Sequence, residues 1–165
     1  MRGVTLGIVA VCVGGFINTA AASDSDTERA SLTGLGNVSV VVEELSAVAT
    51  RSGLTVAAIQ ADTERRLRQA GITVTSDSDA YVYVHITVVD PGGAIPLPYL
   101  VDVSLMQEVT LPRGFKTRTP LQTATWWMNS LGMSGPDLLR ASVNGRVGQF
   151  VDNFVRAFRS VNPAK

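Results

Sequence analysis

The residue types of a serine hydrolase occur together on two predicted strands, 80–89 and 99–111. Both stretches alternate apolar and polar residues, and the turn sequence DPGG follows the first, so we expect them to pair as a hairpin. In the expected register His85 faces Ser104, and Asp102 lies on the same surface. A histidine can take the proton of a serine hydroxyl while an aspartate orients the imidazole. Side chains on a flat sheet lack a nucleophile elbow and an oxyanion hole, so we expect no catalytic residues here.

Ligands for a metal ion or a cofactor are few. The sequence contains one histidine, and its single cysteine, Cys12, lies in a segment that we expect to be removed. Asp77 and Asp79 are typical of a turn, and the stretch SDSD has fewer regularly spaced oxygens than a calcium loop needs. The phosphate-binding pattern GxGxxG is absent from the sequence. We therefore expect neither a metal nor a cofactor.

Aromatic residues indicate a contact surface. Trp126 and Trp127 are neighbours on a predicted strand, so their side chains must leave opposite faces of the sheet. We expect one in the core and the other, Trp126, on the outer surface, where aromatic side chains can stack on a glycan or dock a protein. The alternative is that the chain itself or a second copy covers this surface. The predicted contact residues are Tyr81, Tyr83, His85, Met106 and Trp126.

The first residues have the pattern of a signal peptide. Arg2 provides a positive charge, 3–17 is an uncharged run of 15 residues, and small residues follow up to Ala22. This run is shorter than the roughly 20 residues that a membrane-spanning helix needs. We predict a signal peptide over 1–22 and a periplasmic or secreted protein, without membrane association after cleavage. An uncleaved anchor is the alternative.

Charge is distributed unevenly along the chain. The formal net charge is zero, but 23–111 contains 12 acidic and 5 basic residues, whereas 112–165 contains 2 acidic and 8 basic residues. The folded domain is electrically polarised unless the two halves mix in space. Because nucleic-acid-binding domains are usually basic overall with clustered Lys and Arg, we expect no nucleic-acid partner.

Hydrophobic periodicity predicts one α+β domain over 38–163, behind a flexible polar leader over 23–37. Two amphipathic helices are buried most simply on one face of a mainly antiparallel sheet. This arrangement is a two-layer sandwich of order β-α-β-β-β-β-α, and it leaves the opposite sheet face bare. The predicted strands are 38–45, 72–75, 80–89, 99–111 and 121–128, and the predicted helices are 55–70 and 135–161.

Several residues predict where the helices begin and end. Thr55 is the expected N-cap of the first helix, and Gly71 the residue that ends it. Ser134 with Asp137 resembles a capping box before the second helix. The stripe of that helix is expected to face the core rather than a membrane surface, and its aromatic members are Phe150, Phe154 and Phe158.

Six segments are distinctive in combination, and they extend over nearly the whole chain after the leader: VVVEEL (40–45), ERRLRQAGI (64–72), YVYVHITVV (81–89), LVDVSLMQEVTL (100–111), TATWW (123–127) and VDNFVRAFRSVNP (151–163). Together they resemble an uncharacterised family of small exported bacterial proteins. The resemblance implies export but no activity or site residue. More loosely, the element order is similar to envelope-assembly domains such as the lipopolysaccharide-assembly lipoprotein and TolB-type amino-terminal domains.

The sequence thus predicts a non-enzymatic exported domain that binds a protein, a glycan or another cell-envelope component through the bare sheet face. A homodimer is also possible. The basic stretch with Arg113, Lys116 and Arg118 is a second candidate surface. From a different class, the alternative is a small periplasmic hydrolase whose pocket the sequence does not reveal.

Overall fold

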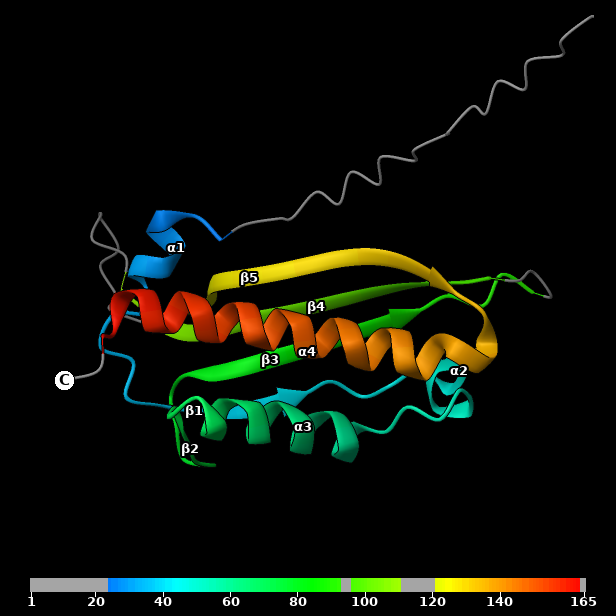
Figure 1. Ribbon diagram of the computed structural model, residues 1–165, viewed down its shortest axis with the longest axis horizontal. Helices are drawn as coiled ribbons and strands as arrows, with labels where there is room; N and C mark the ends of the chain where they lie inside the picture. The colour runs from blue at the N-terminus through cyan, green and yellow to red at the C-terminus, as the bar shows by residue number, and fades with distance from the viewer. Residues whose placement is uncertain (1–23, 93–95, 111–120, 164–165) are drawn as a thin grey trace, which may run out of the picture.

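Five strands form one open sheet in the computed structural model, which describes residues 24–92, 96–110 and 121–163 (Figure 1). The strands are β1 (Asn37–Val42), β2 (Thr73–Val74), β3 (Tyr81–Val88), β4 (Leu97–Val109) and β5 (Leu121–Ser134). The helices of the described residues are α1 (Asp26–Ala30), α2 (Ala47–Arg51), α3 (Val56–Gln69) and α4 (Pro136–Val161).

The sheet is mixed. Its strand order is β2-β1-β3-β4-β5, in which β1 runs parallel to both β2 and β3, while β3, β4 and β5 are antiparallel neighbours. Parallel neighbours need a crossover connection, and α3 lies in the chain between β1 and its two parallel partners. The predicted α+β class is therefore confirmed, and the antiparallel part of the sheet is the long meander from β3 to β5.

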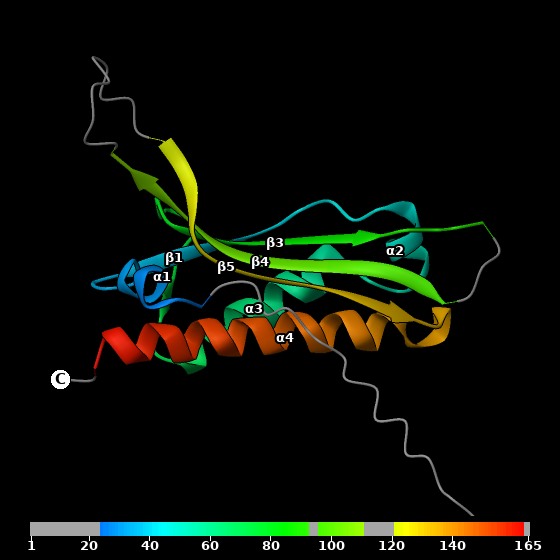
Figure 2. The same ribbon diagram turned by 90° about the horizontal axis from the view of Figure 1, so that it is seen from above.

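The two long helices lie on the same side of the sheet, as the bare-face prediction required. Figure 2 shows α3 and α4 together below the strands, and no helix over the opposite face in the part of the chain that the structure describes. α3 packs against β1 and α4 against β4 and β5, while the two helices also contact each other. The short helix α2 lies at the end of the sheet where β3 terminates (Figure 1).

The core fills the space between this helix layer and the sheet. Alternate residues of β3 are buried, and they belong to one hydrophobic core with Ile59 and Leu67 of α3 and Val151 and Phe154 of α4. Phe150 and Phe154 are buried, and Phe158 packs partly against the core. The aromatic stripe of α4 thus faces the core, as predicted. None of the helices in the described ranges has the length and apolar character needed to cross a membrane.

The segment predicted as a flexible leader is folded from residue 24 onwards. Ser25 and Glu28 form a reciprocal capping box at the start of α1. Leu32 then inserts into the core and is fully buried. The Asn162 side chain fixes the turn after it, because its Nδ2 donates to the Leu32 carbonyl at 2.8 Å and its Oδ1 accepts from the Gly34 amide at 2.8 Å. The polar composition of this segment gave no indication that Leu32 belongs to the core or that Asn162 binds the turn after it.

The helix boundaries agree with the predictions to within one residue at all four ends, and one predicted cap is wrong. Thr55 caps α3 by accepting from the Ala58 amide, and Gly71 follows it with φ +84°. The end of α4 at Val161 also agrees. The predicted capping box at Ser134 is absent: the N-cap of α4 is Gly135, without a side-chain cap, because Ser134 is still the last residue of β5.

Candidate functional site

The face of the sheet that points away from α3 and α4 is the candidate site, and we call it the outer face. Its side chains alternate with the buried ones along β3, β4 and β5, in keeping with the two-residue period of strands. The outer face consists of Val41, Tyr81, Tyr83, His85, Thr87, Leu100, Asp102, Ser104, Met106, Trp127, Asn129, Leu131 and Met133.

The hairpin register differs from the predicted one by a single two-residue step. His85 pairs with Asp102, and Ser104 pairs with Tyr83 on β3 and with Trp127 on β5. A shift of two residues keeps every side chain on its own face, so the apolar pattern alone does not distinguish the two registers. β4 begins at Leu97, two residues earlier than predicted, and this earlier start accompanies the shift.

In the observed register, Ser104, His85 and Asp102 do not have the arrangement of a serine hydrolase triad. Ser104 does not pair with His85, and it is only 5% exposed between Tyr83 and Trp127. Among the described residues, Nε2 of the His85 ring instead lies 3.2 Å from the Thr87 hydroxyl oxygen. The ring also approaches the carboxylate of Glu43, which follows the end of β1. No hydrogen bond in the described ranges joins Ser104 to His85.

The two tryptophans occupy opposite faces, but with the assignment reversed from the prediction. Trp126 is fully buried, and its ring packs edge-on against Phe154 with 5.2 Å between centroids. Its indole N–H donates to Asp24 at 3.3 Å. Trp127 is the residue that lies half-exposed on the outer face. Trp126 is therefore withdrawn from the predicted contact residues, and Trp127 takes its place.

A bulge in β5 separates the two tryptophans from the start of the strand. Leu105 pairs with Trp126, but the next residue, Met106, pairs with Ala124. Thr125 is thus an extra residue on β5, and it changes which residues before and after it share a face. Beyond the bulge Trp126 is opposite the buried Leu105, so it must enter the core.

A row of polar side chains crosses the middle of the outer face. Glu43, which follows β1, lies 3.6 Å from the His85 ring, and His85 pairs with Asp102, which pairs with Asn129. Burial raises the pKa of the Asp102 carboxyl, although a hydrogen bond with Asn129 and the neighbouring imidazole oppose the shift. The Tyr83 hydroxyl donates to Glu43, and this hydrogen bond, more than burial, raises the pKa of Tyr83 to about 12.

Apolar and aromatic side chains lie on both sides of this polar row. Tyr81, Tyr83, Met106 and Trp127 gather on one side. On the other side Leu131 and Met133 are 79% and 67% exposed, the highest values among the large hydrophobic residues of the described chain. Large exposed apolar side chains that share one surface are typical of interaction sites.

The arginines of the described residues lie in the helices, where acidic residues accompany them, and not on the strands. The described ranges contain no lysine. The outer face carries the carboxylate of Asp102, and that of Glu43 lies at its margin. The predicted basic stretch with Arg113, Lys116 and Arg118 lies outside the described residues. The outer face is therefore apolar with an acidic centre.

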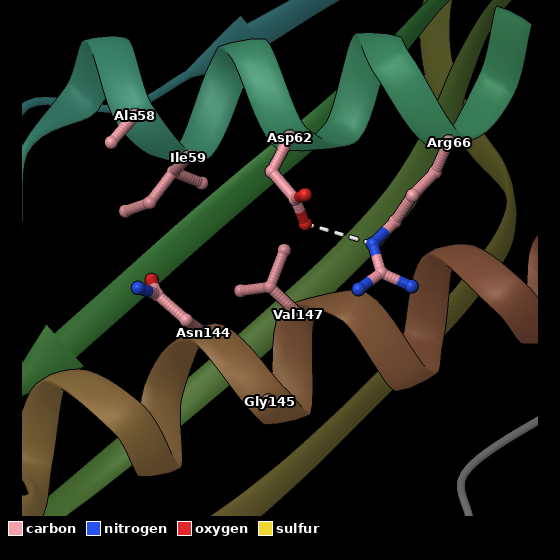
Figure 3. A pocket seen from close by; sticks show the side chains of 7 residues that line it. All are labelled: Ala58, Ile59, Asp62, Arg66, Asn144, Gly145 and Val147. Atoms are coloured by element: carbon pink, nitrogen blue, oxygen red, sulfur yellow. Dashed lines mark hydrogen bonds and ion pairs between the residues drawn. The ribbon is translucent and has the colours of Figure 1, made fainter.

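A groove lies between α3 and α4 on the helix side of the molecule, where Arg66 bridges the two helices (Figure 3). Its Nε donates to Asp62 at 2.8 Å, and its Nη1 donates to both carboxylate oxygens of Asp152 at 3.0 Å. Gly148 on α4 makes room for the guanidinium, because a Cβ there would lie 2.7 Å from Arg66 Nη2. Because Arg66 pairs with Asp62 on its own helix and with Asp152 on α4, the charged groups of this groove join the two helices, which is a structural role.

Two glycines of α4 are expected to respond differently to alanine. Gly145 is exposed, and a Cβ added to it would meet no atom within 4 Å, so Gly145→Ala should raise the free energy of unfolding by about 0.5–1 kcal/mol through helix propensity. Gly148→Ala should show no such gain, since Arg66 must move away from its two aspartates. Urea denaturation measures both values. In an Arg66→Ala background the gain from Gly148→Ala should return, and an equal gain in the native background would contradict the bridging role.

The described residues contain no group of three or more His, Cys, Asp or Glu side chains placed to hold a metal ion. The acidic residues of the predicted turn do not converge on a third ligand in this part of the chain. On the outer face the titratable side chains of Glu43, His85 and Asp102 follow one another in the polar row, where they can form hydrogen bonds with a partner.

Comparison with known proteins finds no matching protein-family model and no matching curated protein. Two similar solved structures are a minor lipoprotein from Acinetobacter baumannii and a PelC dodecamer from Paraburkholderia phytofirmans. The first has a TM-score of 0.40 at 9% identity, over 76% of this chain and 94% of that one. The second has a TM-score of 0.39 at 9% identity, over 76% of this chain and 88% of that one. These values are too low to support a shared function.

Proposed function

We propose that this chain is a non-enzymatic domain of the cell envelope that binds a partner protein through the outer face. The observation that carries the proposal is the uncovered side of the sheet, where Leu131 and Met133 are 79% and 67% exposed on one side of the polar row and the aromatic group of Tyr83 and Trp127 lies on the other. Soluble domains seldom leave such side chains together in water unless a partner covers them. An exported location follows from the signal peptide predicted over 1–22 and belongs to the same proposal.

A protein fits the outer face better than a flat polysaccharide. The rings of Tyr81 and Tyr83 are 6.4 Å apart and inclined at 79° to each other. Two rings at this angle do not offer parallel surfaces on which successive sugar rings can stack. The outer face is instead rich in Tyr, Trp and Met. These residue types are enriched at the centres of protein–protein interfaces relative to the rest of a protein surface.

The charge of the outer face indicates what the partner presents. Asp102 is partly buried at the centre and Glu43 lies on the other side of His85, with no arginine on any strand of the described chain. A partner that buries Asp102 further must supply a donor or a positive charge, because an unpaired buried carboxylate is costly. The proposed partner surface is thus apolar, with a Lys or Arg side chain that reaches the polar row.

Site-specific photocrosslinking would identify the partner. A photoreactive amino acid is placed at Tyr81 or Asn129 on the outer face, or at Ala61 on the exposed side of α3 as a control, and the full chain is expressed in cells that export it. We expect the same protein adduct from both outer-face positions and not from Ala61. Adducts from all three positions, or none from the outer face, would contradict the proposal, as would retention on purified peptidoglycan without any protein adduct.

The affinity for the captured protein then tests the contact residues. Trp127→Ala should weaken binding by at least about tenfold, as expected for an aromatic residue at the centre of an interface. Leu138→Ala is the matched control, because Leu138 is 65% exposed but lies on α4, on the other side of the molecule. An equal loss of affinity in both variants would place the contact elsewhere.

A further inference from the structure

β5 is a long edge strand with a free side. It pairs with β4 over its whole length, from Leu121 to Ser134. Near the start of β5, α1 contacts the strand, and the hydroxyl of Ser31, the C-cap of α1, donates to the Thr125 carbonyl at 3.2 Å. From Trp126 to Ser134 the outward N–H and C=O groups of β5 have no neighbouring strand in the described chain. Such an edge is a template for another strand.

This edge also lacks the usual protection against pairing. Its sequence LQTATWWMNSLGMS contains no charged residue and no proline. Natural edge strands are commonly kept apart by lysines, prolines or shortness. At the opposite edge of the sheet, β2 has only two residues, so it offers little backbone for pairing.

We propose that β5 pairs with β5 of a second copy in antiparallel orientation, about a two-fold axis at Ser130. In such a pair each residue faces a residue of the same segment, so a charge near the axis would meet its own copy and repel it. The uncharged sequence of β5 avoids this repulsion entirely. A strand from an unrelated protein would gain nothing from that neutrality, and we therefore assign the edge to a second copy.

The position of the axis follows from an unsatisfied group. Ser130 Oγ is buried and has no hydrogen-bond partner in the described chain. Ser130 itself is only partly buried at the edge, and a change of its χ1 rotamer can turn the hydroxyl outward. With the axis at Ser130 the two hydroxyls face each other and can form a cross-strand hydrogen bond. This pairing satisfies a donor that a single copy leaves without a partner.

The same axis places the exposed apolar residues of the two copies next to each other. Asn129 then faces Leu131 of the second copy, and Trp127 faces its Met133, all on the outer face. A methionine sulfur beside an aromatic ring is a favourable contact. The two outer faces become one continuous surface, and this holds whether or not that surface binds the partner proposed above.

Two double variants with equal numbers of introduced charges test the axis. Asn129→Lys with Leu131→Lys places like charges opposite each other across the two-fold. Asn129→Lys with Leu131→Glu places opposite charges there instead. Sedimentation equilibrium should show a wild-type dimer, a dissociation constant at least about tenfold weaker for the first variant, and one close to wild type for the second.

Either of two results would overturn the proposal. One is a wild-type chain that sediments as a monomer up to its solubility limit. The other is an equal effect of the two double variants, provided that circular dichroism shows both to be folded. Cysteine crosslinking gives an independent measurement, since Cys12 is the only native cysteine and lies in the predicted signal peptide. Ser130→Cys should yield disulfide-linked dimers on mild oxidation, whereas Ala61→Cys on α3 should not.

Discussion

Trp126→Ala is expected to lower the free energy of unfolding by about 3–5 kcal/mol, the usual cost of removing a large aromatic side chain from a core. Trp126 is fully buried between β5 and α4, where it contacts Phe154 edge-on at 5.2 Å. The substitution also leaves Asp24 without its indole donor. Since small domains are stable by only about 5–15 kcal/mol, the variant should unfold at much lower urea concentration. Urea denaturation followed by circular dichroism measures the change.

Trp127→Ala is the matched control, because the two residues are neighbours of the same type on opposite faces. Trp127 is half-exposed, so its removal should change stability far less, by about 1 kcal/mol or below. Tryptophan fluorescence gives a second readout: iodide should quench Trp127 in the native protein and leave Trp126 protected. Equal destabilisation by the two substitutions, or quenching of both residues, would contradict the faces assigned to them.

The reversed tryptophans show where sequence patterns stop being informative. Alternation along β5 predicts that Trp126 and Trp127 face opposite ways, and this is correct. It does not tell which one enters the core, because Thr125 is a bulge that resets the alternation within the strand. A bulge has no apolar signature of its own. It depends on the pairing between Leu105 and Trp126, which is a tertiary feature.

The hairpin register could not be predicted for a related reason. Sliding β4 by two residues against β3 keeps Val101, Val103 and Leu105 in the core, so both registers bury the same set. The choice decides, however, that His85 faces Asp102 rather than Ser104. Alternation therefore predicted the outer face and its members on β3 and β4, while Leu131 and Met133 lay beyond the predicted end of the last strand and the arrangement of the polar row required the strand pairing.

The layer arrangement could be predicted because both long helices carry a strongly amphipathic pattern. α3 buries Ile59, Thr63 and Leu67 at spacings of four, and α4 buries a corresponding stripe. Each stripe must meet apolar side chains, and one sheet face satisfies both. The short elements α1 and α2 lack such a stripe and depend on caps and single core residues, so periodicity did not reveal them.

The N-terminal segment provides the second large expected effect. Leu32→Ala should lower the free energy of unfolding by about 2–5 kcal/mol, because Leu32 is fully buried in the shared core. A flexible leader would instead tolerate this change without measurable loss. Urea denaturation separates the two cases directly, and Asn162→Ala offers an independent check at the other end of the chain, where its amide bonds to Leu32 and Gly34.

Leu138→Ala is the control for the same residue type, since Leu138 is 65% exposed on α4 and its loss should cost about 0.5 kcal/mol or less. If Leu32→Ala were as mild as Leu138→Ala, the docking of the N-terminal segment would be wrong. If the loss is large, the folded domain begins soon after the predicted cleavage position. The signal peptide would then be followed almost at once by core structure, and Asp24 and Leu32 would belong to the domain that carries the outer face.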